Sequence, residues 1–352
     1  MTERKVEVSP RMVLFLIIGL LFFVAYLHFF VNIPEMMDAL TNAGGNIYFY
    51  LLAATASVLN ITLYSFSWHL LLKLTSVKSA FKKAFLFVWT GIFVDFIIPF
   101  ESVSSDIVKI YLMAKDTGEN AGKIAASVMG NRILSMAVTI GGLIFGSVLL
   151  TLSYTLPQTV LFVMWFEIFG SAASLIIICY LIFFEEEKTW KAINLLLNFF
   201  VWLFRGHWNL SNIKTKLHAI LQAFHRNMEI FSKNPKWLSK PLLLLITAWF
   251  LDISTMFLVF HAIGFNVSFL AVVVVYSLML AVQAIPFGIP SELGFIEIVM
   301  ASLFVAFGVP SGTSAAATVL TRILTFWSRI MIGYVAAQWV GLKTVKGMPS
   351  IL

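Results

Sequence analysis

The sequence has few of the residues that stabilise soluble proteins. Charged residues make up 12% of the 352 residues and hydrophobic residues 60%, whereas a soluble domain has roughly 25% charged residues. The single cysteine, Cys179, cannot form a disulfide within the chain. Paired cysteines, closely spaced histidines, phosphate-binding loops and a nucleophile elbow are also missing, so nothing indicates a metal, a cofactor or an enzyme. A soluble single-core protein is excluded.

Long hydrophobic runs are what the sequence does have, and they predict an all-helical, multi-pass membrane protein. About 20 apolar residues are needed for one helical crossing. The runs are too long and unbroken for the alternating strands of a transmembrane barrel. The first lacks a small-residue cleavage pattern, so we expect it to be a span rather than a signal peptide. Six stretches reach the required length: 12–31, 47–72, 124–152, 160–184, 241–263 and 314–340.

The basic residues predict the orientation of these spans. Lys and Arg precede the first span, follow the second, gather in 185–240 and recur near the end of the chain. The loop after the first span, 32–46, has neither. By the positive-inside rule, the basic clusters and both termini face the cytoplasm of a cell-membrane protein. The net charge of +7 is therefore explained without a nucleic-acid partner.

Two further apolar regions are too short or too broken for one crossing. Pro99 separates segments 84–98 and 106–114, and the second region, 267–284 and 294–308, is interrupted by Pro286 and Pro290. If 185–240 is cytoplasmic, each region must return to the side from which it entered. We therefore predict two re-entrant helical hairpins. Non-helical backbone is tolerated at membrane depth only where it is buried in protein or lines a wet cavity.

The two hairpin regions resemble each other. Ile-Pro-Phe occurs at 98–100 and 285–287, and Arg-Ile-Leu begins at Arg132 and Arg322 in the spans that follow. Each match alone is weak, and coincidence in an Ile-, Leu- and Phe-rich chain remains the alternative. Three full spans separate the hairpins, so the copies would be inverted, as in alternating-access transporters. The predicted organisation is one domain, 1–352, with repeats at about 47–152 and 241–341 and a cytoplasmic amphipathic connector at 185–240.

The connector contains an apolar stripe at helical spacing. Basic residues lie off the stripe, which is typical of a surface helix attracted to anionic lipid. A helix packed on the cytoplasmic face of the protein itself is the open alternative. The stripe consists of Ile213, Leu217, Ile220, Leu221, Phe224 and Met228.

The hairpin motifs resemble those of a known family. Its first motif, Pro, Gly-Gly-Glu and Arg, corresponds to Pro99, Ser104-Ser105-Asp106 and Lys109. Its second, Pro-Gly-Gly-apolar-Gly followed by Glu, corresponds to Pro290-Ser291-Glu292-Leu293-Gly294 and Glu297. Over about 85–339 the chain thus resembles the lysylphosphatidylglycerol synthase transmembrane-region family of flippase-like proteins. That family includes the membrane half of the bacterial multiple peptide resistance factor and archaeal relatives. Ser-Ser and Ser-Glu replace both Gly-Gly pairs, where backbones would approach closely.

The resemblance implies movement of a lipid or lipid-phosphate, either a phospholipid or a polyprenyl-linked one, between leaflets. It also implies, as an alternative, a membrane partner in lipid-linked glycan chemistry. We expect a non-enzymatic flippase-like transporter without a cofactor. The rival hypotheses are a membrane enzyme acting on lipid-linked phosphate and a non-catalytic partner of a glycosyltransferase.

Charged residues predicted at membrane depth are the candidate substrate-binding residues. Arg132 and Arg322 match arginines of the family, and a guanidinium can bind phosphate bidentately. The alternative is that they pair with Asp106 and Glu297 and hold the hairpins. Lys109 can likewise pair with Asp106 or contact a ligand. The acids, which include Glu101 and Glu292, can serve in proton coupling or in helix capping. The predicted structural breaks are Pro99, Pro286, Pro290 and Gly294.

Three more acids lie within predicted membrane segments. Asp252 is in the middle of its span, Glu167 is nearer the outer end of another, and Asp95 is in the short first arm of a hairpin. Charged side chains at this depth usually face a partner or a wet cavity. Each of the three is therefore either a cavity residue or one member of a structural pair.

Overall fold

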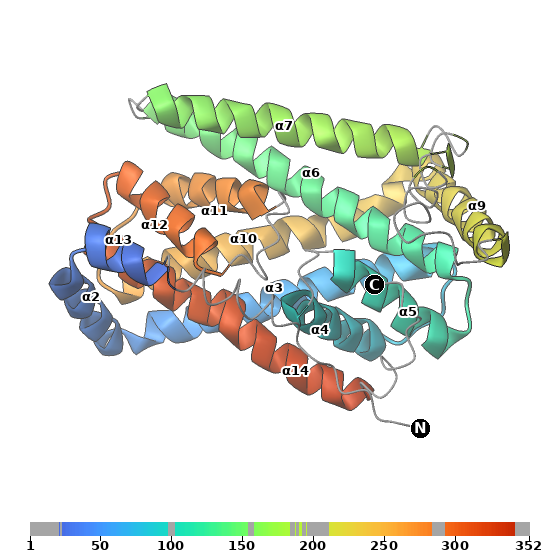
Figure 1. The fold of residues 1–352 in the computed structure, drawn as a ribbon, viewed down its shortest axis with the longest axis horizontal. Helices are drawn as coiled ribbons and strands as arrows, with labels where there is room; N and C mark the ends of the chain where they lie inside the picture. The colour runs from blue at the N-terminus through green and yellow to red at the C-terminus, as the bar shows by residue number, and fades with distance from the viewer. Residues whose placement is uncertain are drawn as a thin grey trace.

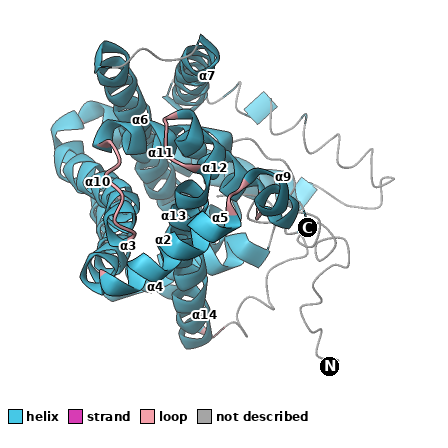
Figure 2. Ribbon diagram, turned by 90° about the vertical axis from the view of Figure 1, so that its left-hand side faces the viewer, coloured by secondary structure: helices cyan, strands magenta, loops and turns pink. Residues whose placement is uncertain are grey.

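The computed structural model describes residues 21, 23–97, 103–153, 158–183, 187, 190–191, 195, 211–283 and 293–341. Every element in these ranges is helical, which confirms the predicted all-helical class. The longer helices follow the long axis of the molecule (Figure 1). Viewed along that axis, they are seen nearly end-on (Figure 2).

Four of the described helices are long and apolar enough to cross a membrane. At 1.5 Å per residue, the 28 residues of α3 extend about 42 Å, against roughly 30 Å of bilayer hydrocarbon. The four confirm the helices expected at 47–72, 124–152, 241–263 and 314–340. They are α3 (Ile47–Leu74), α6 (Ala121–Ser153), α10 (Ser239–Ala262) and one continuous helix, Ser311–Val340.

The other two predicted spans are described in part. A helix, α7 (Gln158–Phe183), occupies the predicted span 160–184. Phe162, Phe166 and Phe169 on α7 are each more than 65% exposed, as lipid-facing side chains would be. Most of the predicted span 12–31 lies outside the described residues.

Both regions predicted to be broken consist of two short helices. The first contains α4 (Phe81–Ile97) and α5 (Val103–Thr117), and the second contains α11 (Phe269–Gln283) and α12 (Phe295–Ala306). The 17 residues of α4 extend about 26 Å and the 12 of α12 about 18 Å, both less than the hydrocarbon thickness. α4 packs on α5, and α11 packs on α12. The turns between them, with Pro99, Glu101, Pro286, Pro290 and Glu292, lie outside the described residues.

The long helices that precede and follow each broken pair pack against helices of the other half of the chain. α3 precedes the first pair and α10 the second; the two pack together and run in opposite directions (Figure 1). α6 packs on α11, and α14 (Ser328–Val340) packs on α4. Glycines permit both contacts: a Cβ on Gly146 would lie 2.6 Å from Val273 Cγ1, and one on Gly333 would lie 2.6 Å from the Trp89 carbonyl oxygen. We call α3 to α6 the first half of the chain and α10 to α14 the second. Each long helix thus touches the other half.

The helix Ser311–Val340 changes its winding near its middle. α13 (Ser311–Arg322) leads into a π-helical segment, Ile323–Trp327, and then into α14. The Leu324 carbonyl there accepts hydrogen bonds from Ser57 Oγ at 3.1 Å and Ser328 Oγ at 2.5 Å. This segment was not predicted from the sequence. Such segments often occur at functional sites, and this one begins directly after Arg322.

The region after the first span is helical, so the expectation of a loop at 32–46 was wrong. It forms α2 (Ile33–Gly45), which packs on α13. Glu35 Oε1 accepts hydrogen bonds from the Thr313 amide at 3.3 Å and the Thr313 hydroxyl at 2.9 Å. Helices had been predicted only from long or broken apolar runs and from the apolar stripe within 185–240, which is why a short helix held by its neighbour was missed.

The amphipathic stripe of the connector lies on a helix, as predicted. It is α9 (Ser211–Lys233), which packs on α6. Leu221 and Met228 are buried, and Met228 shares an apolar cluster with Leu71 and Ala126. These contacts favour the interpretation that α9 packs on the protein itself.

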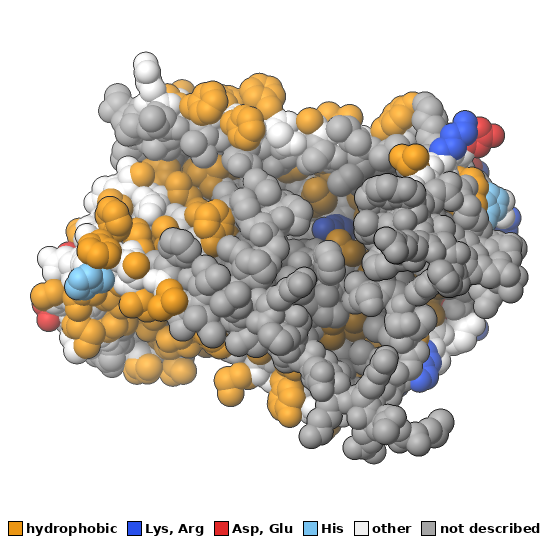
Figure 3. Space-filling view, in the orientation of Figure 1, with side chains coloured by type: hydrophobic (Ala, Val, Ile, Leu, Met, Phe, Trp, Pro, Cys, Tyr) orange, Lys and Arg blue, Asp and Glu red, His pale blue; other side chains and the backbone are white. Residues whose placement is uncertain are grey.

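One face of the molecule is mainly apolar between the two ends of the long axis. In the face shown in Figure 3, hydrophobic side chains lie over most of the described middle region, and acidic and basic side chains gather mainly towards the ends. This distribution fits a protein whose middle is surrounded by lipid.

Candidate functional site

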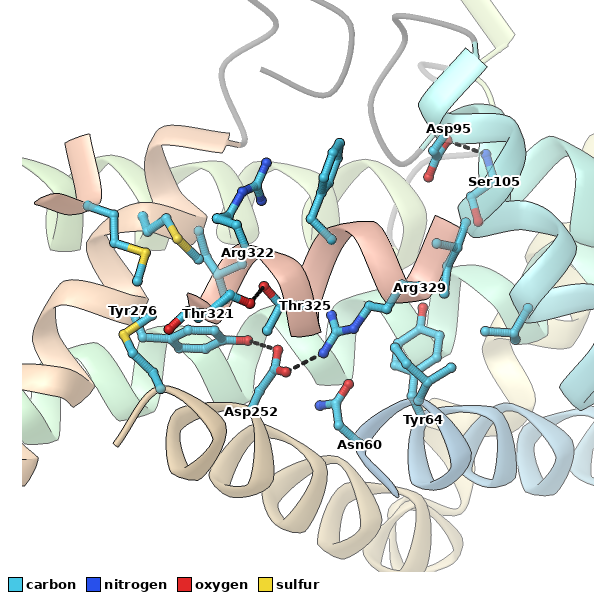
Figure 4. Close-up of a pocket in the computed structure, with 18 of the residues that line it drawn as sticks. Asn60, Tyr64, Asp95, Ser105, Asp252, Tyr276, Thr321, Arg322, Thr325 and Arg329 are labelled. Carbon is cyan, nitrogen blue, oxygen red and sulfur yellow. Dashed lines mark hydrogen bonds and ion pairs between the residues drawn. The ribbon is translucent and has the colours of Figure 1, made fainter. Parts of the chain in front are cut away.

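A cavity of about 340 Å³ lies where the inner ends of the broken helices meet the long helices. Its polar lining comes from both halves of the chain, and Figure 4 labels these side chains except Asp106 and Lys109. α3, α4 and α5 contribute Asn60, Tyr64, Asp95, Ser105, Asp106 and Lys109. α10, α11 and the helix Ser311–Val340 contribute Asp252, Tyr276, Thr321, Arg322, Thr325 and Arg329.

In the second half, Arg322 is held by Glu297. Arg322 Nε lies 2.6 Å from Glu297 Oε1, and the two side chains are 9% and 8% exposed. The other carboxylate oxygen of Glu297 accepts a hydrogen bond from the Gly294 amide at 2.7 Å. Gly294 has a φ of +89°, which glycine adopts without strain, at the start of α12. Glu297 therefore pairs with an arginine and also caps a helix, two of the alternatives weighed from the sequence.

In the first half, Asp106 holds two cations. Its carboxylate lies 2.8 Å from Arg132 Nη1 and 2.7 Å from Lys109 Nζ. Lys109 is 4% exposed and lies over the rings of Tyr64 and Trp68, 5.5 and 5.9 Å from their centroids. The local pairing of Lys109 with Asp106 is thus present.

The two arginine–acid pairs are built alike. Each links the long helix that follows a broken pair to the first turn of the second short helix, with partners 26 residues apart in one case and 25 in the other. They differ at the cavity, because Arg322 is among its described lining residues and Arg132 and Glu297 are not. The first half contributes Asp106 and Lys109 instead.

α4 and α5 approach each other closely where serine replaces a family glycine. Asp95 Oδ1 accepts a hydrogen bond from the Ser105 amide at 2.7 Å. A Cβ on Gly91 would lie only 2.4 Å from Ser105 Oγ. The glycine that permits the close approach is therefore on the facing helix, which explains why Ser105 is tolerated.

A second charged cluster joins three helices in the second half. Tyr276 Oη donates a hydrogen bond to Asp252 Oδ2 at 2.6 Å, and Arg329 Nη2 pairs with Asp252 Oδ1. Asp252 was predicted at membrane depth, but neither of its partners was predicted. Arg329 lies seven residues after Arg322 in the same predicted span, about two helical turns, and this spacing was the available signal.

Some buried donors at the cavity have no hydrogen-bond partner among the described groups. They are Arg322 Nη2, Arg329 Nε and the Thr321 hydroxyl. Arg322 is 7% exposed and Thr321 2% exposed. Buried polar groups in proteins nearly always have a hydrogen-bond partner, so these donors are suited to an anionic ligand.

The side chain of Glu167 lies outside the described residues, as do Glu101 and Glu292. Within the part of the chain that the structure describes, no three His, Cys, Asp or Glu residues form a possible metal site.

The apolar helices and the buried charged cavity are those of a helical membrane protein. Residues 16–333 match the family described as the lysylphosphatidylglycerol synthase TM region, and the chain belongs to this family. The family predicted from the hairpin motifs is therefore confirmed. The chain is 26% identical to a UPF0104 membrane protein of Pyrococcus horikoshii over 295 residues, covering 82% of this chain and 86% of that protein. It is 24% identical to one of Methanocaldococcus jannaschii over 335 residues, or 94% and 95%.

Proposed function

We propose that the protein moves a lipid with an anionic, phosphate-containing headgroup between the leaflets of the cell membrane. The observation that carries this proposal is the set of unpartnered donors on Arg322, Arg329 and Thr321, three residues that line the central cavity. Guanidinium groups bind phosphate oxygens through directed, charge-assisted hydrogen bonds. Phospholipids and polyprenyl-linked phosphates both present such oxygens.

The charges around the cavity suit transient rather than permanent binding. Each described cation there already has a carboxylate partner, as in the Arg322–Glu297 and Arg329–Asp252 pairs. A phosphate would use the remaining donors and compete with the carboxylates for the guanidinium groups. A transporter requires this balance, because a site that binds too tightly does not release its substrate.

We propose further that the fold consists of six spans and two re-entrant hairpins related as inverted repeats, with both termini in the cytoplasm. The antiparallel packing of α3 and α10 supports this, as does the reciprocal packing of α6 on α11 and of α14 on α4. The equivalent Arg132–Asp106 and Arg322–Glu297 pairs are a third line of support. Such repeats would allow the cavity to open to either side in turn.

Labelling of single cysteines in a Cys179→Ala background tests this orientation. Cysteines at positions 82, 123 and 233 and at the C-terminus are expected to be shielded from an impermeant reagent outside intact cells. Cysteines at positions 42, 154 and 311 are expected to react. External labelling at position 233 would contradict the re-entrant arrangement, because position 233 can lie outside only if α4 and α5 together make one full crossing.

A leaflet assay with the purified full chain tests the activity. In phosphatidylcholine vesicles containing a little fluorescent phosphatidylglycerol, dithionite bleaches only probe in the outer leaflet. We expect the protein to make nearly all of the probe accessible within minutes, against about half in protein-free vesicles. Fluorescent phosphatidylcholine tests the requirement for an anionic headgroup. Chemical conversion of the probe would favour the enzyme hypothesis, and neither movement nor conversion would favour a non-catalytic partner.

A further inference from the structure

The Asp252 carboxylate is held differently from the other acids around the cavity. Glu297 accepts from Arg322 and from a backbone amide, Asp106 holds two cations, and Asp95 accepts from a backbone amide. Asp252 has one cation, Arg329, on Oδ1 and one hydroxyl, that of Tyr276, on Oδ2 (Figure 4). One oxygen of Asp252 is thus held by a guanidinium and the other by a neutral hydroxyl.

We propose that Asp252 takes up one proton when the anionic headgroup binds, so that the protein carries lipid anion and proton together. This inference rests on the proposed function and supplies its energy source. The proton comes from water and bonds to Oδ1 of Asp252. Arg329 is thereby released from the neutralised acid and pairs with the headgroup phosphate. For a headgroup with one negative charge, the total charge in the cavity is the same before and after.

Tyr276 favours placing the proton on the oxygen of Asp252 that holds Arg329. Its hydroxyl already donates to Oδ2 at 2.6 Å, and Asp252 is its one described hydrogen-bond acceptor. A proton on Oδ2 would weaken that hydrogen bond, because a protonated carboxyl oxygen is a poorer acceptor than a carboxylate oxygen. The proton therefore goes to Oδ1, where it displaces Arg329.

The membrane environment gives the coupling its direction. An uncompensated charge buried at this depth is costly, so an anion entering a balanced cavity favours neutralisation of one acid. The other polar and charged groups that line the cavity come from the helices around Asp252. α3 contributes Asn60 and Tyr64, α11 contributes Tyr276, and the helix Ser311–Val340 contributes Arg322 and Arg329; Asp95, Asp106 and Lys109 line the far side.

A pH gradient across vesicles tests the coupling. The full chain is reconstituted in phosphatidylcholine vesicles with fluorescent phosphatidylglycerol, and potassium with valinomycin holds the membrane potential at zero. With one proton per lipid, the probe should accumulate in the leaflet on the alkaline side. The limiting ratio between leaflets is about tenfold per pH unit, because one pH unit is worth about 1.4 kcal/mol. Protein-free vesicles give the rate of unaided movement.

Variants assign the effect to Asp252. Asp252→Asn should give a leaflet ratio near one under the gradient, whatever the rate at which it moves the probe. Tyr276→Phe keeps the ion pair and frees Oδ2 for the proton, so it should transport with a much smaller ratio. Glu229→Gln, at an exposed pair on α9, should behave like the unaltered protein.

The outcomes separate this inference from the proposed function. If the unaltered protein equilibrates the probe but the ratio stays at one, proton coupling is wrong and the transport function stands. If it moves no probe, the proposed function itself fails. If Asp252→Asn does not fold, Tyr276→Phe decides: a full tenfold ratio in that variant overturns the role assigned to Asp252.

Discussion

Replacing Glu297 by Gln is expected to destabilise the protein by about 3–5 kcal/mol, because it leaves Arg322 as an unpaired buried cation. Gln can still accept the hydrogen bond of the Gly294 amide, so the change isolates the charge. Removing the charge of Arg322 as well, in Glu297→Gln/Arg322→Gln, should restore most of the stability. Unfolding by SDS in mixed micelles measures these differences.

Transport distinguishes the structural role of Arg322 from binding of the headgroup. If Arg322 binds phosphate, the doubly substituted protein folds but moves fluorescent phosphatidylglycerol roughly ten- to a hundredfold more slowly. That range corresponds to one hydrogen bond to a charged group, about 1.5–3 kcal/mol. Arg322→Lys should also be slow, because lysine keeps the charge and loses the fork of donors. Arg226→Gln, at an exposed position on α9, is the control. Normal transport by the double variant would leave Arg322 a structural role alone.

Most helices could be predicted from the sequence because the membrane imposes a simple rule. A run of about 20 apolar residues must satisfy its backbone hydrogen bonds internally, and a helix does so. Runs that are shorter or broken by proline cannot cross, which predicted the α4–α5 and α11–α12 pairs. Helix α2 is neither a run of about 20 apolar residues nor part of a broken apolar run. It depends on contacts with α13, 279 residues away between Asn32 and Ser311, and no local pattern reveals them.

The partners of the charged residues could be predicted only where a repeat or motif linked them. Arg132 and Arg322 follow similar hairpins, so pairing with Asp106 and Glu297 could be predicted as one of two alternatives. The Asp252–Arg329 pair joins residues 77 apart on helices with no shared motif. The π-helical segment between Arg322 and Arg329 also changes the relative direction of these side chains, and apolar periodicity does not encode it. Tyr276 was missed because its hydroxyl acquires a role only through its contact with Asp252.

Replacing Asp106 by Asn is expected to have the largest effect on stability in the first half of the chain. It removes the carboxylate shared by Arg132 and Lys109, and Lys109 is almost fully buried. We expect a loss of about 3–5 kcal/mol, measured by SDS unfolding of the purified protein.

Asp116→Asn is the matched control, because Asp116 forms an ion pair with Lys83 in which the two side chains are 30% and 48% exposed. An exposed pair of this kind contributes about 0–1 kcal/mol. Adding Lys109→Met to Asp106→Asn should recover part of the loss, since the remaining cation, Arg132, is 33% exposed and can keep its charge hydrated. Equal losses for Asp106→Asn and Asp116→Asn would mean that the buried charge of Lys109 is compensated by other groups. In that case the shared carboxylate would not be what holds α5 to α6.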